Sequence, residues 1–207
     1  MALSDDIWWT RKARIQAEKR LLSYAFQSQL ILLWYSFFGV AVSIYYLKFS
    51  NDHDLAGVTW VIYSVLSLCI SGFLTGLSFK ERASLIKECY ETLKGILQQA
   101  KLIEKEGNNQ SSDKMREVHV EYSRVLSLCE NHTDIDMTNA LCLEYLNSHE
   151  KLNTETGLKD NFTKGPTEYQ WKQYRRNIRK NRVVIFLLYT LPFAIFLVLE
   201  VLNESVR

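Results

Sequence analysis

The chain contains the uncharged stretch LLSYAFQSQLILLWYSFFGVAVSIYYL, Leu21–Leu47, followed after the short polar link Lys48–Asp54 by LAGVTWVIYSVLSLCISGFLTGLSF, Leu55–Phe79. At about 1.5 Å per helical residue the second run spans roughly 37 Å, and the most apolar part of the first, Leu30–Leu47, spans about 27 Å, against a hydrocarbon core of ~30 Å. Soluble helices of this length normally carry a charged face, and neither run has one. The pattern therefore predicts an all-α membrane protein with a transmembrane hairpin over residues 21–79, and it disfavours a buried hairpin of a soluble helical protein.

A third apolar run, Val183–Leu199, precedes the end of the chain. As a helix it covers about 25 Å, and Val201 and Leu202 can lengthen it. Pro192 is compatible with a membrane helix, because neighbouring helices can satisfy the carbonyl that it frees. We expect a third transmembrane helix over residues 183–202, with a re-entrant or interfacial segment as the alternative.

Lys and Arg residues are distributed unevenly around these runs. Five cations precede the first run, one lies in the link, three follow the second run and six precede the third. Because cytoplasmic flanks carry the excess of Lys and Arg, the N-terminus and residues 80–182 are predicted to be cytoplasmic, in a multi-pass protein of the cell inner membrane. The cations are Arg11, Lys12, Arg14, Lys19 and Arg20; Lys48; Lys80, Arg82 and Lys87; and Lys172, Arg175, Arg176, Arg179, Lys180 and Arg182.

Residues 1–20 combine paired tryptophans with a basic cluster. Such a combination suits a cytoplasmic headgroup interface, where the rings lie at the boundary and the cations meet anionic lipid. The alternative is an ordinary solvated basic helix that leads into the first span. The candidate interfacial anchors are Trp8, Trp9, Arg11, Lys12 and Arg14.

The cytoplasmic insert, residues 80–182, has helical periodicity. Apolar residues recur at steps of three and four in two segments, separated by Gly107-Asn108-Asn109, which predicts two antiparallel amphipathic helices followed by a shorter one. Either seam can pack within the chain or against a second copy. The seams are Ile86, Cys89, Leu93, Ile96, Ala100 and Ile103, and then Met115, Val118, Tyr122, Val125 and Cys129.

The sequence carries no pattern for catalysis, a metal or a cofactor. The four cysteines form no paired framework, and Cys129-x-x-His132 near Cys142 and His149 does not match a zinc-knuckle spacing. Phosphate-binding glycine loops and nucleophile turns are absent from the sequence. Lys and Arg number 25 against 23 Asp and Glu, so the net charge of +2 does not favour direct nucleic-acid binding.

The informative polar groups lie inside the predicted hairpin. On an ideal helix Ser64, Ser67, Ser71, Thr75 and Ser78 fall within an arc of about 80°, and the first run has a similar polar face. These faces can make helix–helix contacts, for which small residues are favourable, or can line a water-filled pathway in an oligomer. The candidate pore-lining or helix-packing residues are Ser36, Gly39, Ser43, Ser64, Ser67, Ser71, Gly72, Thr75 and Gly76.

The stretch IWWTRKARIQAEKRL, which runs into the hairpin, and the charged segment beginning FKERA together resemble the SLATT superfamily over residues 7–106. The most specific portion of the resemblance is the pair of elements Trp-x-Arg-Lys-Ala-Arg and Ala-Glu-Lys-Arg-Leu. The resemblance implies a small bacterial membrane protein with two transmembrane helices and a cytosolic helical part. Members are encoded beside nucleotide-signal synthases, nucleotide-sensing domains or reverse transcriptases, and are thought to act as pore-forming effectors in antiphage suicide. The C-terminal extension resembles the reverse-transcriptase-associated subset.

Two functions from different classes follow. The first is an oligomeric pore-forming effector of a bacterial antiphage, abortive-infection system that permeabilises the inner membrane when triggered by a cytosolic sensor, nucleotide-signal or reverse-transcriptase partner. The second is a non-conducting membrane anchor or scaffold that recruits a cytosolic partner through the helical insert. Ion flux separates them, because a scaffold does not leak.

Overall fold

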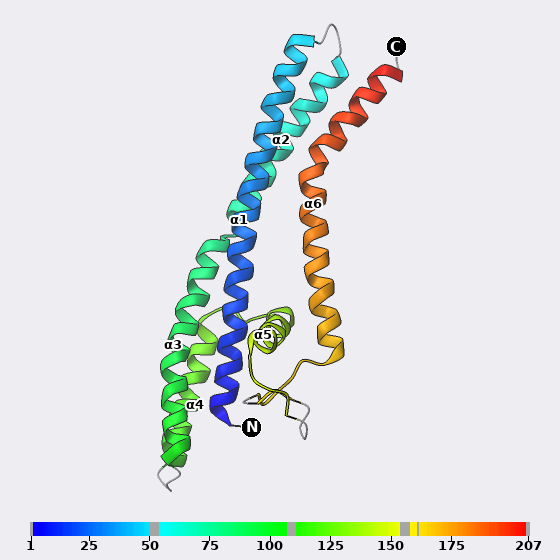
Figure 1. Ribbon diagram of the computed structural model, residues 1–207. Coiled ribbons are helices and arrows are strands. Elements are labelled where there is room, and N and C mark those ends of the chain that lie inside the picture. Colours follow the sequence, from blue (N-terminus) through cyan, green and yellow to red (C-terminus); the bar gives the residue numbers. More distant parts are fainter. Residues whose placement is uncertain (1, 50–53, 107–110, 154–157, 161, 206–207) are drawn as a thin grey trace. The chain divides into compact units, whose positions relative to one another are not determined.

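A computed structural model describes the chain except for residues 1, 50–53, 107–110, 154–157, 161 and 206–207. The described residues form six α-helices, and an isolated antiparallel bridge joins Leu152 and Lys159 (Figure 1). Three helical segments are long and apolar enough to cross a membrane, which confirms the predicted all-α class with three such helices. The helices are α1 (Leu3–Phe49), α2 (Asp54–Gly76), α3 (Phe79–Glu106), α4 (Ser111–Leu128), α5 (Asp134–Asn147) and α6 (Glu168–Ser205).

The chain divides into two compact units. Met1–Leu22 and Phe79–Ile178 form one, here called the bundle unit, and Ser23–Ser78 and Arg179–Arg207 form the other, called the span unit. Helices α1 and α6 each contribute residues to both. The basic N-terminal segment therefore belongs to the same unit as the predicted cytoplasmic insert. From the sequence pattern alone, the two are predicted as separate segments.

The second apolar run ends as a helix earlier than its composition predicts. Helix α2 stops at Gly76, and Ser78 has a φ of 45°, in the left-handed region that is uncommon for a residue with a side chain. A new helix, α3, then begins at Phe79. The break falls where the two units meet in the sequence, so Ser78 does not continue the hydroxyl face of α2.

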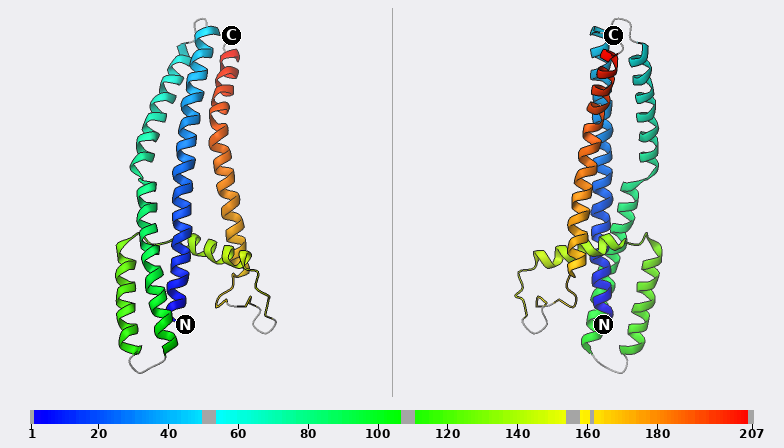
Figure 2. Two further views of the ribbon diagram at one scale, coloured as in Figure 1. Left: turned by 60° about the vertical axis from the view of Figure 1, so that its left-hand side comes forward. Right: turned by 90° about the vertical axis from the view of Figure 1, so that its right-hand side faces the viewer.

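The core of the bundle unit lies between α3, α4 and the start of α1. Helices α3 and α4 run side by side in both views of Figure 2. Leu93 and Ala100 of α3 are completely buried, and they cluster with Val125 of α4 and Ile7 of α1. The α3 seam is thus occupied by intrachain contacts and is not free to bind a second copy, which corrects the oligomerisation alternative for this surface.

Helix α5 is attached to α1 by a buried ion pair. Thr133 is its N-cap and forms a capping box with Asp136, the arrangement expected for residues that start a helix. The Asp136 carboxylate is fully buried and accepts hydrogen bonds from Arg20 Nε at 2.8 Å and Nη2 at 2.9 Å. One carboxylate therefore both begins α5 and holds it against α1.

We expect Asp136→Ala to destabilise the bundle unit by about 3 kcal/mol, since breaking a buried pair leaves an uncompensated charge and removes the cap. The matched control is Glu130→Ala, because Glu130 pairs with Arg82 at 2.6 Å while its side chain is 43% exposed. Exposed pairs contribute less than about 1 kcal/mol. Native-state hydrogen exchange of the α5 amides measures both, and equal losses of protection would contradict the assignment.

Candidate functional site: a hydroxyl-lined groove

The span unit has an aromatic core formed by all three of its helices. Phe38 of α1 and Trp60 of α2 are buried, with ring centroids 6.2 Å apart, and Phe196 of α6 packs against the same cluster. Large apolar side chains on the outer faces, such as Leu33 and Phe73, remain exposed. That distribution is the one a lipid environment requires, because the surrounding solvent is itself apolar.

Pro192 removes one backbone donor from the middle of α6, which frees the carbonyl of Leu188. The Tyr35 hydroxyl of α1 donates to that carbonyl at 2.9 Å. Tyr63 of α2 in turn donates to the carbonyl of Tyr35 at 3.2 Å. A neighbouring helix therefore satisfies the carbonyl as expected, and two tyrosines link the three helices.

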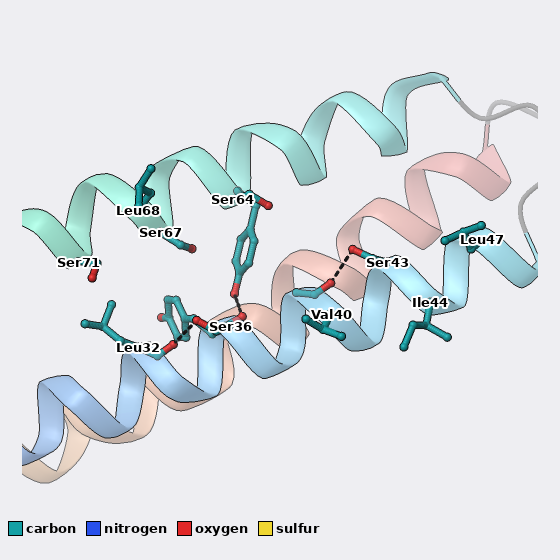
Figure 3. Close-up of a pocket in the computed structure, with 13 residues that line it drawn as sticks. Leu32, Ser36, Val40, Ser43, Ile44, Leu47, Ser64, Ser67, Leu68 and Ser71 are labelled. Atoms are coloured by element: carbon teal, nitrogen blue, oxygen red, sulfur yellow. Dashed lines mark hydrogen bonds between the residues drawn. The ribbon is translucent and has the colours of Figure 1, made fainter.

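A groove lies between α1 and α2 (Figure 3), and its volume is about 480 Å³. Its polar lining comes from two helical faces, one on each helix, and six of the nine candidate pore-lining or packing residues lie there. Apolar side chains that include Leu32, Val40 and Leu68 complete the wall. The six candidate residues are Ser36, Gly39, Ser43, Ser64, Ser67 and Ser71.

Three of the groove hydroxyls are satisfied inside their own helices. Ser36 donates to the carbonyl of Leu32 at 2.9 Å, and Ser43 donates to Gly39 at 2.8 Å. Ser64 makes the same bond within α2, at 2.9 Å. This back-bonding lets a serine lie at membrane depth without water, while its oxygen can still accept a bond. The groove is chemically suited to both dry packing and hydration.

The other three candidate residues, Gly72, Thr75 and Gly76, do not line the groove. Thr75 is exposed and donates to the Ser71 carbonyl at 2.9 Å. A Cβ added at Gly72 or Gly76 would meet nothing within 4 Å, whereas one at Gly39 would lie 3.6 Å from the Tyr63 ring. Within the hairpin Gly39 therefore faces the Tyr63 ring at an ordinary contact distance, and the Gly72–Gly76 face is uncovered in a single copy.

The N-terminal candidate anchors lie in the bundle unit, in contact with protein. Trp9 is only 2% exposed and donates to Thr163 at 3.3 Å, and Arg14 is completely buried. Buried side chains cannot meet lipid headgroups, so the interfacial interpretation of these two residues is not supported by their positions. Lys12 pairs with Glu144 at 2.9 Å and lies 5.2 Å from the Trp8 ring.

Arg11 is only partly buried, and its Nε donates to the carbonyl of Tyr90 at 3.3 Å. The sequence contained a signal for this packing. Ala13, Ala17 and Leu21 recur every four residues and are all buried, so they continue an apolar helix stripe through the basic cluster. The stripe is hard to recognise in the sequence because cations lie between its members.

Three helices that are long and apolar enough to cross a membrane, with a groove between two of them, together with a polar helical bundle, define the class of helical membrane proteins. The chain belongs to the SMODS and SLOG-associating 2TM effector domain family 5, whose model matches residues 1–199. The matched region includes most of α6, so a third apolar helix lies within a family described by two transmembrane segments. No curated protein and no solved structure matches the chain.

Tyr35→Phe should destabilise the span unit by roughly 0.6 to 1.7 kcal/mol, the range of interhelical hydrogen bonds in membranes. In a Pro192→Ala background the same change should cost less, because residue 192 then supplies its own N–H to the Leu188 carbonyl. Unfolding of the detergent-solubilised protein measures this double-mutant cycle. Equal costs of Tyr35→Phe in both backgrounds would refute the link between the proline and the tyrosine.

Proposed function

We propose that this chain is an oligomeric pore-forming effector of the bacterial inner membrane, in which the groove between α1 and α2 supplies the wall of a water-filled pathway. The observation that carries the proposal is the gathering of six serine and glycine residues on one groove, between two helices that are long and apolar enough to cross a membrane. The opposite faces of these helices are apolar and suited to lipid.

Oligomerisation is part of the proposal because two helices cannot enclose water by themselves. The uncovered Gly72–Gly76 face supports it, since small residues four apart let a neighbouring helix approach closely in a membrane. With the α3 seam buried inside each chain, assembly through the spans is the arrangement that we favour. Groove faces from several copies would then surround a common pathway.

The membrane topology and partners are also inferred. Lys and Arg flanks support a cytoplasmic N-terminus and a cytoplasmic bundle unit, with the 48–54 link outside. The family description associates these effectors with SMODS and SLOG proteins, so we infer that a cytosolic signalling partner acts on the bundle unit. An abortive-infection role and a place in the reverse-transcriptase-associated subset follow from resemblance alone, as extensions of the proposal.

A specific observation supports the alternative, a non-conducting scaffold. Ser36, Ser43 and Ser64 already donate to their own backbones, so the groove does not need water to be stable. A scaffold of this kind would use the groove to pack helices and would pass no ions. Measurements of flux therefore decide between the two.

Leucine substitution on α2 tests the pore. Ser67→Leu and Ser71→Leu should each reduce ion flux to a small fraction of the parent value, because bulky apolar groups favour dewetting of a narrow pathway. Thr75→Leu is the matched control, since Thr75 lies on the same helix outside the groove and should keep most of the flux. Proteoliposome leak is measured beside oligomer size, after activation where a trigger is known.

The pore assignment fails if the active parent passes no ions. It also fails if the three variants lose flux equally, or only in proportion to the assembled protein that is lost.

Single-cysteine labelling tests the topology. In a chain whose four native cysteines are replaced, His53→Cys should react with an impermeant reagent in intact cells. Val120→Cys, an exposed position of α4, should react only after permeabilisation. Strong labelling of position 120 in intact cells would place the bundle unit outside and overturn the orientation.

A further inference from the structure

Arg14 of α1 has unusual partners for a buried cation. Its Nη1 donates to the sulfur atoms of both Cys89 on α3 and Cys129, just after α4, and its Nη2 lies 3.4 Å from the Leu126 carbonyl. The side chain is completely buried, and its Nε has no hydrogen-bond partner within the described residues. Among the residues that the structure describes, no carboxylate forms an ion pair with the Arg14 guanidinium.

The Arg14 guanidinium therefore lacks a carboxylate counter-charge among the described residues. A buried guanidinium without a counter-charge is costly, and a thiolate beside it would compensate the charge. Reactive cysteines are found next to Arg or Lys at partly exposed positions, and redox-sensing cysteines lie beside a second thiol that can resolve the oxidised form. The two cysteine sulfurs accept hydrogen bonds from the same Arg14 Nη1 atom, so they lie close to each other.

The two thiols have different exposure and therefore different roles. Cys129 is half-buried, so a small oxidant can reach it. Cys89 is buried and donates to the Val125 carbonyl at 3.3 Å. Burial is the main reason that the pKa of Cys89 is raised to about 12, which keeps it a thiol. Cys129 is suited to react first and Cys89 to resolve.

We propose that Cys129 and Cys89 are a dithiol modification site for peroxides. The Cys129 thiolate attacks one peroxide oxygen, the O–O bond breaks, and the departing hydroxide takes up a proton to become water, which leaves a sulfenic acid. The Cys89 sulfur then attacks the Cys129 sulfur, the S–OH bond breaks, and the hydroxide leaves with the Cys89 proton as a second water. Two thiols are oxidised to one disulfide, and one peroxide is reduced.

The positive charge of Arg14 argues against a metal site at these two cysteines. The Arg14 guanidinium donates to both sulfurs and repels a divalent cation from them, so the cluster is better suited to an oxidant than to zinc. The disulfide would join α3 to the end of α4, closing the hairpin at the end opposite its turn. Cys142 is buried, as Cys89 is, but within the described residues it contacts neither a second thiol nor a guanidinium, so it serves as an internal comparison.

The test uses the full chain in nanodiscs, with Cys69→Ser and Cys142→Ser so that only the pair remains. After hydrogen peroxide, denaturation and alkylation with N-ethylmaleimide, intact mass should show no alkylation and a loss of two hydrogens. Reduction should restore two alkylated thiols. Adding Cys89→Ser should leave Cys129 as a sulfenic acid that dimedone traps, whereas Cys129→Ser should leave Cys89 unmodified.

A chain that retains only Cys142 should stay reduced at the same peroxide dose. Arg14→Lys keeps the positive charge, and circular dichroism checks its fold; it should still form the bond, whereas Arg14→Met, if folded, should slow its formation about tenfold or more. Two free thiols after peroxide, a disulfide between chains, or oxidation of Cys142 as fast as Cys129 would each overturn the proposal.

Discussion

Hydrocarbon offers no hydrogen-bond partners, so the backbone groups of a helix that crosses a membrane depend on the protein for their hydrogen bonds. This constraint explains contacts that composition alone does not. Pro192 frees the Leu188 carbonyl, and the Tyr35 hydroxyl replaces the lost donor at 2.9 Å. Trp34 Nε1 donates at 3.1 Å to the carbonyl of Tyr189, one residue further along α6. Polar aromatic side chains of α1 thereby stabilise the helix that contains the proline.

The same constraint shapes the groove. Serine hydroxyls that donate to their own helices, as Ser36 and Ser43 do, are stable without water and can still accept hydrogen bonds. The groove can therefore be dry in one assembly and hydrated in another, which is the chemical property that a triggered pore needs. In the bundle unit the groups that need protein partners are buried charges, such as Asp136, which pairs with Arg20.

Much of this architecture could be predicted from periodicity and composition. Three uncharged runs predicted three apolar helices, and a spacing of 100° per residue placed Ser64, Ser67 and Ser71 on one face, the face that lines the groove. The partners of Trp9 and Arg14 were not predictable in this way, because they lie 75 to 154 positions away in the chain. A cluster of tryptophan and cations has the same local pattern in a helical core as at a headgroup layer.

The proposed pore requires the groove face of α2 to meet water in the conducting state. Substituted-cysteine accessibility tests it most directly, by comparing Ser67→Cys on the groove with Leu66→Cys on an exposed apolar face, in a chain without other cysteines. In the conducting state a charged, membrane-impermeant thiol reagent should modify position 67 about tenfold faster or more and block the current, because the reagent reacts with the thiolate and neither the reagent nor a thiolate is stable in hydrocarbon. Equal modification at both positions, or modification of 67 that leaves the current unchanged, would contradict the account.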